Sequence, residues 1–287
     1  MAPNNRFALI EDFVRHDQVI SGEKFLIHTK MNYEFNYLKR DFFYRGGIWR
    51  GKVVHSFISR RKLFISKPLV IGHSDIPTRV VDGLIAKRLG IPQLFAVNNQ
   101  PLEGFSQSIP LGITNNCDDS PIHRILGDES HFLKANDEAF NSDSFIPSVY
   151  LNFTAGNNRG VRSSVLAIAN QIANIYKVVI SLPDFSTSGR IQYLRNLRTS
   201  GLVLCPEGNG VDTHRFWETL YMGGVPVVTK NPMMEFFYNN LPVIQLNTWS
   251  ELENRSLIEE KWLEITSRSF DFSIMSSAYW LKKFSDL

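Results

Sequence analysis

The sequence predicts an α/β fold made of two Rossmann-like units that follow one another along the chain. Short apolar runs alternate with segments of helical periodicity, and strands alternating with helices indicate parallel sheets. The chain has 287 residues, about twice the length of a typical domain. Its composition, 43% hydrophobic and 21% charged, is typical of soluble globular proteins.

The first unit is expected to begin with a strand and a helix and to continue with a strand–helix–strand repeat. The helix before Gly90 ends at a residue type that commonly closes helices. A polar stretch at 128–144, with two Asn, three Asp and two Glu, then marks the end of the unit. In order, the elements are a strand at 24–28, a helix at 33–43, a strand at 69–72, a helix at 78–89 and a strand at 93–97.

The second unit repeats the alternation from residue 149. Its expected strands lie at 149–153, 178–181, 202–205, 225–229 and 241–246, and its helices at 163–176, 191–199 and after residue 212. An aromatic helix at 278–284 is expected to pack back across both units. These patterns predict a first domain at 1–147, a second at 148–268 and a C-terminal helical segment at 269–287.

Composition and charge exclude several partners and cofactors. Lys and Arg total 31 against 28 for Asp and Glu, and the net charge of +3, without a dense basic run, argues against nucleic acid. Cys117 and Cys205 lie too far apart, and too far from His, to suggest zinc or a disulfide framework. No run of about 18 apolar residues predicts membrane insertion, so we expect a soluble, cytoplasmic protein.

The stretch 208–228, GNGVDTHRFWETLYMGGVPVV, carries the strongest functional pattern. It follows an expected strand and opens a helix, the place where open α/β sheets bind anions. Gly208 and Gly210, on either side of Asn209, allow close approach to the backbone, and Asp212 or Thr213 can cap the helix.

Arg215 and Glu218 lie one turn apart on that helix. A cation at a helix N-terminus is unfavourable by itself, so Arg215 predicts a bound anion such as a diphosphate, with Glu218 accepting bonds from ribose hydroxyls. The alternative is an exposed helical ion pair beside a simple turn. His214 is more simply a packed or surface residue than a catalytic one.

The segment 205–228 resembles the donor-binding signature of exostosin-like glycosyltransferases. The resemblance implies a GT-B fold, with two Rossmann-like domains facing across a cleft and a nucleotide sugar bound by the second. It places Arg215 on the diphosphate and Glu218 on the ribose, and it implies an inverting reaction. Retaining GT-B enzymes often carry a second glutamate eight positions earlier, where this chain has Gly210. The chain departs from animal exostosins in being much shorter, so their substrates and secretory location are not assumed for it.

A second loop, at 154–162, adds candidate donor contacts. Arg159 and Arg162, with Asn158 before them, open the next helix and could reach the same diphosphate. The alternative is a pair of solvent-exposed arginines at a helix start.

The first unit is expected to supply the catalytic base and the acceptor contacts. Asp75 follows the strand at 69–72 and faces the donor domain, with His73 and Glu103 as rival bases. Asn98 and Asn99 follow the next strand on the acceptor side. The alternative for each is turn chemistry or helix capping.

These observations together predict transfer of a sugar from a nucleotide-diphosphate donor, UDP more than GDP, to a hydroxyl of a glycan or glycoprotein with inversion. No metal or other cofactor is expected, because Arg215 and the helix terminus supply the charge. The alternatives are a GDP-fucose-type fucosyltransferase, which has a similar C-terminal motif, and a non-catalytic nucleotide-sugar-binding module. A nicotinamide dehydrogenase does not fit, because Thr213 occupies the place of the third glycine of its motif.

Overall fold

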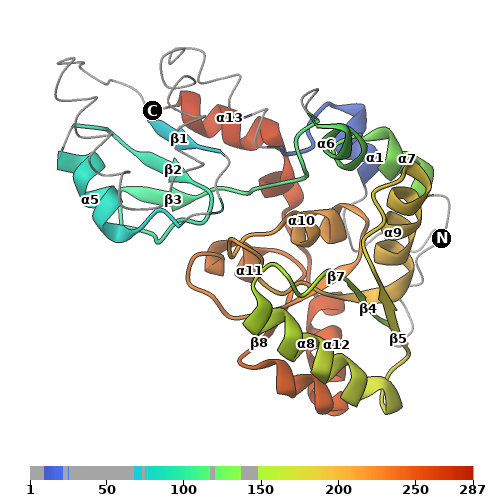
Figure 1. Cartoon of the computed structure of the whole chain (residues 1–287). Helices are drawn as coiled ribbons and strands as arrows, with labels where there is room; N and C mark the ends of the chain where they lie inside the picture. The colour runs from blue at the N-terminus through green and yellow to red at the C-terminus, as the bar shows by residue number, and fades with distance from the viewer. Residues whose placement is uncertain are drawn as a thin grey trace.

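The computed structural model describes residues 10–21, 25, 68–72, 75, 77–88, 90–116, 120–136 and 148–286. These residues form a mixed α/β fold with two parallel sheets (Figure 1). The strand expected at 24–28 lies outside the described residues except for Phe25, and the helix expected at 33–43 lies outside them entirely.

The first sheet has three parallel strands in the order β1-β2-β3. They are β1 (Leu69–Ile71), β2 (Leu94–Ala96) and β3 (Ser106–Ser108), with α5 (Val80–Arg88) between β1 and β2. Ala86 of α5 packs in a small apolar cluster with Leu94 and Phe105. The sequence analysis missed β3, because its residues Ser-Gln-Ser carry no apolar signal.

The second sheet has five parallel strands in the order β5-β4-β6-β7-β8. Its strands are β4 (Ser148–Asn152), β5 (Val178–Ser181), β6 (Gly201–Leu204), β7 (Val225–Thr229) and β8 (Ile244–Leu246). The helices among and after them are α8 (Arg159–Gln171), α9 (Thr187–Ser200), α10 (His214–Tyr221), α11 (Glu235–Asn240) and α12 (Arg255–Ser267), with short 3₁₀ turns at Ile172–Asn174 and Trp249–Glu253.

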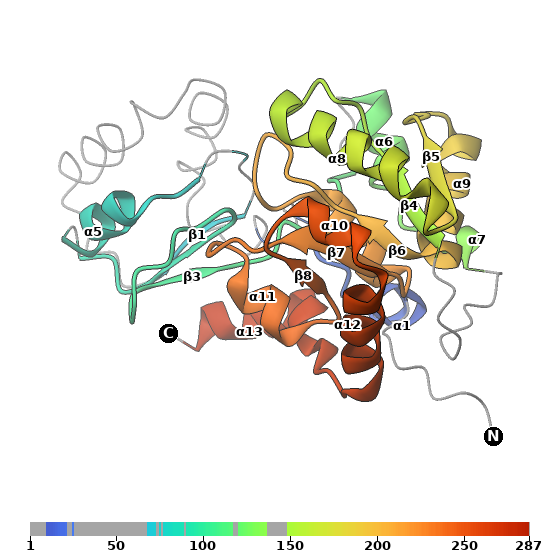
Figure 2. The same cartoon turned by 90° about the horizontal axis from the view of Figure 1, so that it is seen from below.

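Side chains that alternate along these strands fill two separate apolar layers. Leu151 of β4 packs with residues of α8 and α12, whereas Tyr150 packs with residues of α9, α10 and α11. Helices therefore cover both faces of the sheet, as expected for a doubly wound α/β unit (Figure 2).

Three short helices that precede the second sheet in sequence lie beside it in space. They are α1 (Ile10–Arg15), α6 (Pro121–Leu126) and α7 (Ser130–Ala135), and α7 packs along α9 (Figure 1). The polar stretch expected to mark the end of the first unit thus contains a helix that buries His131 and Phe132. Residues 120–136 belong to the packing of the second sheet, although the predicted division assigns them to the first domain.

The C-terminal helix α13 (Ser277–Ser285), which follows the 3₁₀ turn Phe272–Met275, joins the two sheets. Its Phe284 ring lies 4.9 Å from Phe95 of β2, and its fully buried Trp280 lies 6.1 Å from Phe237 of α11. One apolar core therefore runs from the first sheet through α13 into the second.

Candidate functional site

The carboxyl edge of the second sheet is where the sequence-predicted donor residues gather. The loop after β4 leads into α8 and the loop after β6 leads into α10, so both helix starts lie at the same edge. In parallel α/β sheets this is the edge at which ligands bind.

Arg162 reaches across this edge from α8. Its side chain is buried, Nε donates to the Glu207 carbonyl at 3.1 Å, and Nη1 donates to the Thr154 carbonyl at 3.3 Å. The guanidinium also lies over the Phe153 ring, 5.5 Å from its centre. These contacts fix Arg162 between the two glycine-containing loops.

Arg215, in the first turn of α10, lies over the same ring at 5.4 Å. Its Nη2 donates to the Asn152 carbonyl, and its buried Nε has no hydrogen-bond partner among the described residues. Burial, and then the charge of Arg215, lower the pKa of Arg162 to about 10. Two like charges are thus held beside one aromatic ring, an arrangement that an anion would stabilise.

Gly208 and Gly210 lie where a larger residue would collide with neighbouring side chains. A Cβ on Gly208 would lie 2.9 Å from Nη2 of Arg162, and a Cβ on Gly210 would lie 2.6 Å from Nδ2 of Asn98. The Gly208 amide also donates to the Gly210 carbonyl at 2.9 Å. The glycines let the loop approach Arg162 on one side and the first sheet on the other.

Asp212 is buried and links the two halves of the chain through its hydrogen bonds. Its side chain is not exposed at the carboxyl edge of the second sheet. One carboxylate oxygen accepts from the Leu111 amide at 2.8 Å and the other from the Trp217 indole at 2.7 Å. Its own amide donates to Oδ1 of Asn98 at 2.7 Å. Burial raises the pKa of Asp212 to about 7, against the opposing effect of these bonds to the carboxylate. The expected donor-binding role of Asp212 is therefore not supported by its position.

Thr213 and His214, like Asp212, have positions within the fold that indicate a structural role. Thr213 occupies the cap position of α10, but its side chain makes no capping bond. His214 makes a hydrogen bond of 2.8 Å from Nδ1 to the Gly112 carbonyl, and because a carbonyl only accepts, Nδ1 carries the proton. Burial lowers the pKa of His214.

Glu218 has buried partners that the sequence analysis did not identify. Oε1 lies 2.8 Å from Nη2 of Arg190, Oε2 accepts from the Tyr193 hydroxyl at 2.7 Å, and the side chain is 6% exposed. The structure thus pairs Glu218 with Arg190 and not with Arg215, so the interpretation as an exposed helical pair is wrong. Glu218 can contact a ribose only if it gives up its bond to Arg190 or its bond to Tyr193.

Two predicted residues of the α8 loop stay at the surface. Arg159 is exposed at the first position of α8, and Asn158 adopts a left-handed backbone, with φ of 55°, at the cap position without a capping bond. Of the two predicted arginines of this loop, only Arg162 joins Arg215 at the Phe153 ring.

On the first-half side, Asp75 and Asn98 lie against the loop that carries the two glycines. Oδ2 of Asp75 accepts from Nδ2 of Asn209 at 3.4 Å, and both side chains are exposed. Asn99 is fully buried and donates to Ser106 at 3.2 Å. His73 lies outside the described residues.

Glu103 is exposed in the turn that precedes β3. That turn lies at the amino end of the strand, away from the carboxyl edge, which argues against Glu103 as a rival base.

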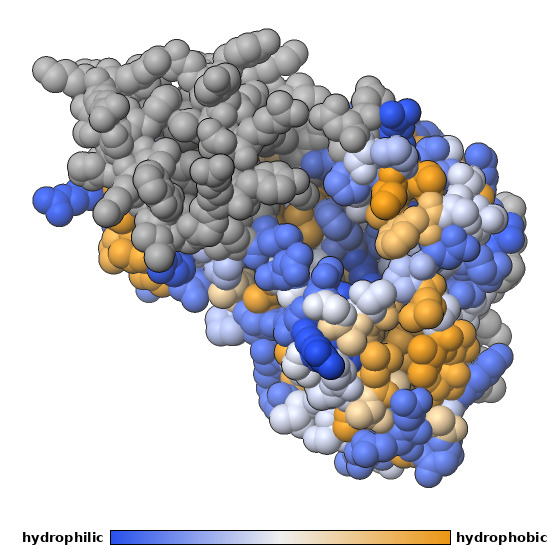
Figure 3. Space-filling view, in the orientation of Figure 1, coloured by the Kyte–Doolittle hydropathy of each residue, from blue (hydrophilic) through white to orange (hydrophobic). Residues whose placement is uncertain are grey.

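An apolar surface borders the same region. Ile180, Leu182 and Phe185, in β5 and the loop after it, are 46%, 75% and 49% exposed. Figure 3 shows hydrophobic side chains gathered where Figure 1 draws β4 and β5. The edge therefore combines paired cations with exposed apolar side chains.

Sequence reasoning missed Phe153, Arg190 and Tyr193 as residues that organise the site. Phe153 was assigned only as the end of a strand, although its place at the carboxyl edge is itself a signal. Arg190 and Tyr193 lie 28 and 25 positions before Glu218, and no local pattern connects them.

Within the described ranges, no group of three or more His, Cys, Asp or Glu side chains could hold a metal ion. No helix among the described residues is both long and apolar enough to cross a membrane. No protein-family model matches the chain, and no curated protein matches it.

Proposed function

We propose that this protein is a glycosyltransferase that uses a nucleotide-diphosphate sugar, with UDP favoured, and transfers the sugar to a glycan or glycoprotein hydroxyl with inversion. The pairing of Arg162 and Arg215 on the Phe153 ring is the observation that carries the proposal. It lies at the carboxyl edge of a parallel sheet, between two loops that contain glycine, and at the start of a helix. Paired cations at such an edge are suited to a diphosphate.

In the proposed reaction, the arginine pair acts on the leaving group, which is the diphosphate. As the bond from the anomeric carbon to the diphosphate oxygen breaks, its electron pair moves to the diphosphate, and the two guanidiniums stabilise that charge. Charge stabilisation of this kind is commonly the largest single contribution to catalysis. The exposed ring of Phe185 offers a surface for a planar base at the same edge.

The acceptor oxygen attacks the opposite face of the anomeric carbon and loses its proton to a base on the first-half side. Asp75 is our candidate, because its carboxylate is exposed and lies 3.4 Å from Asn209 in the glycine loop. Its position supports a base that faces the donor across the junction of the two halves, as a GT-B arrangement requires. The products are the glycoside, the nucleoside diphosphate and the protonated carboxyl group.

Donor binding and donor hydrolysis test this function together. The protein is titrated with UDP, GDP and inorganic pyrophosphate in EDTA and then in magnesium, and incubated with a panel of UDP and GDP sugars, with NAD as the control. We expect binding that EDTA does not weaken and slow hydrolysis of one sugar nucleotide, with the anomer inverted.

Each other outcome has a definite meaning. Hydrolysis of GDP-fucose alone would support the fucosyltransferase alternative, and binding without turnover would indicate a nucleotide-sugar-binding module. A loss of binding of more than tenfold in EDTA would show that a metal bridges the diphosphate and would overturn the role given to the arginine pair.

A further inference from the structure

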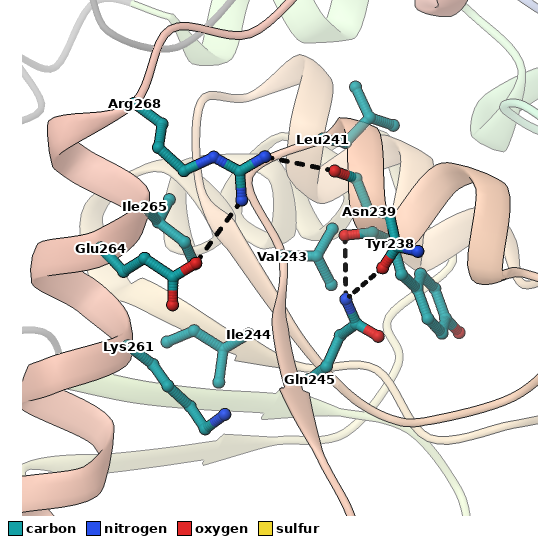
Figure 4. A pocket seen from close by; sticks show the side chains of 10 residues that line it. All are labelled: Tyr238, Asn239, Leu241, Val243, Ile244, Gln245, Lys261, Glu264, Ile265 and Arg268. Carbon is teal, nitrogen blue, oxygen red and sulfur yellow. Dashed lines mark hydrogen bonds and ion pairs between the residues drawn. The ribbon is translucent and has the colours of Figure 1, made fainter.

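Two adjoining cavities lie along α11, apart from the arginine pair and the glycine loop. The first has a volume of about 560 Å³ and lies between β3 and α11. The second, of about 280 Å³, lies between the end of α11, β8 and α12 (Figure 4). Asn239 lines both, so the two cavities adjoin at the C-terminal end of α11.

The described lining of the first cavity combines apolar residues with uncharged hydrogen-bonding side chains. Gln93, Gln107 and Asn240 contribute amides, and the side chains of Gln93 and Gln107 make no hydrogen bond to any described residue. Phe236 adds a partly exposed aromatic ring, and Glu235 is the one charged residue among the described residues of the lining. Among these described residues, a phosphate or carboxylate would therefore meet a like charge and no cation.

The second cavity has a mixed lining, in which Gln245 carries an amide and Lys261, Glu264 and Arg268 are charged. Nε2 of Gln245 donates to the Tyr238 carbonyl and to Oδ1 of Asn239, both at 3.1 Å, which orients its remaining oxygen. Arg268 is held by Glu264 at 3.6 Å and by the Asn239 carbonyl at 3.3 Å. Figure 4 shows the Arg268–Glu264 pair and Gln245 on opposite sides of the space. The pairing balances the Arg268 charge within the protein.

We infer that the two cavities form one groove that binds a chain of neutral sugar units. This inference rests on the proposed function, since the groove would hold remote units of the glycan acceptor. A sugar hydroxyl both donates and accepts, and an amide side chain offers both groups. An apolar ligand would leave the amides of Gln93 and Gln107 unpaired, at a cost comparable to a lost hydrogen bond. The volume of the first cavity lies within the range of roughly 300 to 1,000 Å³ typical of ligand sites.

Direct binding of neutral oligosaccharides tests the groove. Fluorescently labelled linear gluco-, manno- and xylo-oligosaccharides of two, four and six units are titrated into the full chain without donor. We expect one series to bind, more tightly at four units than at two, because a longer chain crosses Asn239 into the second cavity. Saturating pyrophosphate should not displace it.

Gln107→Met keeps the side-chain length and removes the amide. Since Gln107 has no described side-chain partner, the melting temperature should stay the same, while oligosaccharide affinity falls roughly three- to tenfold, as expected for one lost hydrogen bond. Gln171→Met, the same change at an exposed residue of α8, serves as the matched control and should bind as the parent does.

Several results would overturn the inference. These are no binding of any neutral series at millimolar concentration, equal affinity in Gln107→Met and the parent, or displacement by pyrophosphate. An extended peptide that competes for the groove would instead indicate strand addition at the β3 edge. Failure of UDP and pyrophosphate to bind, with oligosaccharide binding intact, would reject the transferase proposal and leave the groove standing.

Discussion

Arg190 and Glu218 form a buried ion pair in which the side chains are only 2% and 6% exposed. The same Nη2 that lies 2.8 Å from Glu218 also donates to the Leu126 carbonyl at the end of α6. Arg190 also lies over the rings of Phe132 and Tyr193. The pair therefore joins α10 to α9 and to the short helices that precede the second sheet.

Glu218→Gln should destabilise the protein by about 3 to 5 kcal/mol, the usual cost of leaving one charge of a buried pair without its partner. Urea unfolding measures this loss. Glu259→Gln is the matched control, because the Arg255–Glu259 pair has the same 2.8 Å separation but is exposed, and it should cost about 1 kcal/mol or less. Equal losses in the two variants would contradict the structural role of Glu218.

Arg215→Ala should weaken pyrophosphate binding by about 1.5 to 3 kcal/mol, the range for a charged hydrogen bond lost. Arg159→Ala is the control, because Arg159 also lies in the first turn of a helix at this edge but is exposed. Calorimetric titration compares the two. A similar loss in both would mean that overall charge, and not the pair at Phe153, attracts the anion.

Gly208→Ala should reduce pyrophosphate affinity, measured on the folded protein at a temperature well below its melting point. The new methyl group would lie 2.9 Å from Nη2 of Arg162, the far end of a long side chain, which can move aside and leave the anion site. Gly160→Ala in α8 is the control, since nothing lies within 4 Å of its added Cβ. Unchanged affinity in Gly208→Ala would show that the position of Arg162 does not matter for binding.

Asp75→Asn should lower turnover by about 10²- to 10⁴-fold, as expected for loss of a general base, with donor affinity unchanged. The amide oxygen can still accept from Asn209, so the local loop should persist. Steady-state kinetics and donor titration measure the two effects separately. Turnover within tenfold of the parent would remove Asp75 from the mechanism and make His73 the next base to test.

Asp212 predicts a pH dependence of stability. Burial raises its folded-state pKa to about 7 from an ordinary value of 3.8. A raised folded-state pKa stabilises the fold fully below the unfolded-state pKa, and this contribution is lost as the pH rises through the folded-state pKa. The side chain of the Asp212→Asn variant does not titrate. Relative to this variant, the unfolding free energy of the parent should therefore fall as the pH rises from 4 to 8. A constant difference would show that Asp212 is ionised throughout.

The second sheet was predictable because its strands are apolar and most of them are separated by helices with a clear period. The strands at 178–181 and 225–229 have the predicted bounds, and the helix carrying Arg215 begins after the predicted cap residues. The short elements α7 and α11 were missed, since six residues barely establish a helical period. The helix α12 was missed as well, although it has 13 residues.

Residues of the candidate site could be predicted only where a single loop carries the whole sequence pattern. Arg162 and Arg215 could be proposed because they follow glycine-containing loops at strand ends. Their shared position over the Phe153 ring could not be predicted. Asp212 was interpreted as a cap because Asp is a common capping residue. Its partner, the Leu111 amide, lies 101 positions away, and nothing local indicates it.

The contacts of the N-terminal segment constrain how the chain can fold during synthesis. The Ile20 amide donates to the Tyr221 hydroxyl, 201 positions later, and the Ser277 amide donates to the Gln18 carbonyl. A ribosome releases residues 10–21 long before these partners exist, so the segment can dock only after Tyr221 and Ser277 have been synthesised. In a nascent chain stalled before Tyr221, Ile10 and Phe13 of α1 would lack part of their docking site, and exposed apolar side chains of this kind are targets for chaperones. Residues 10–21 should therefore dock late, after the strands of both sheets have been synthesised.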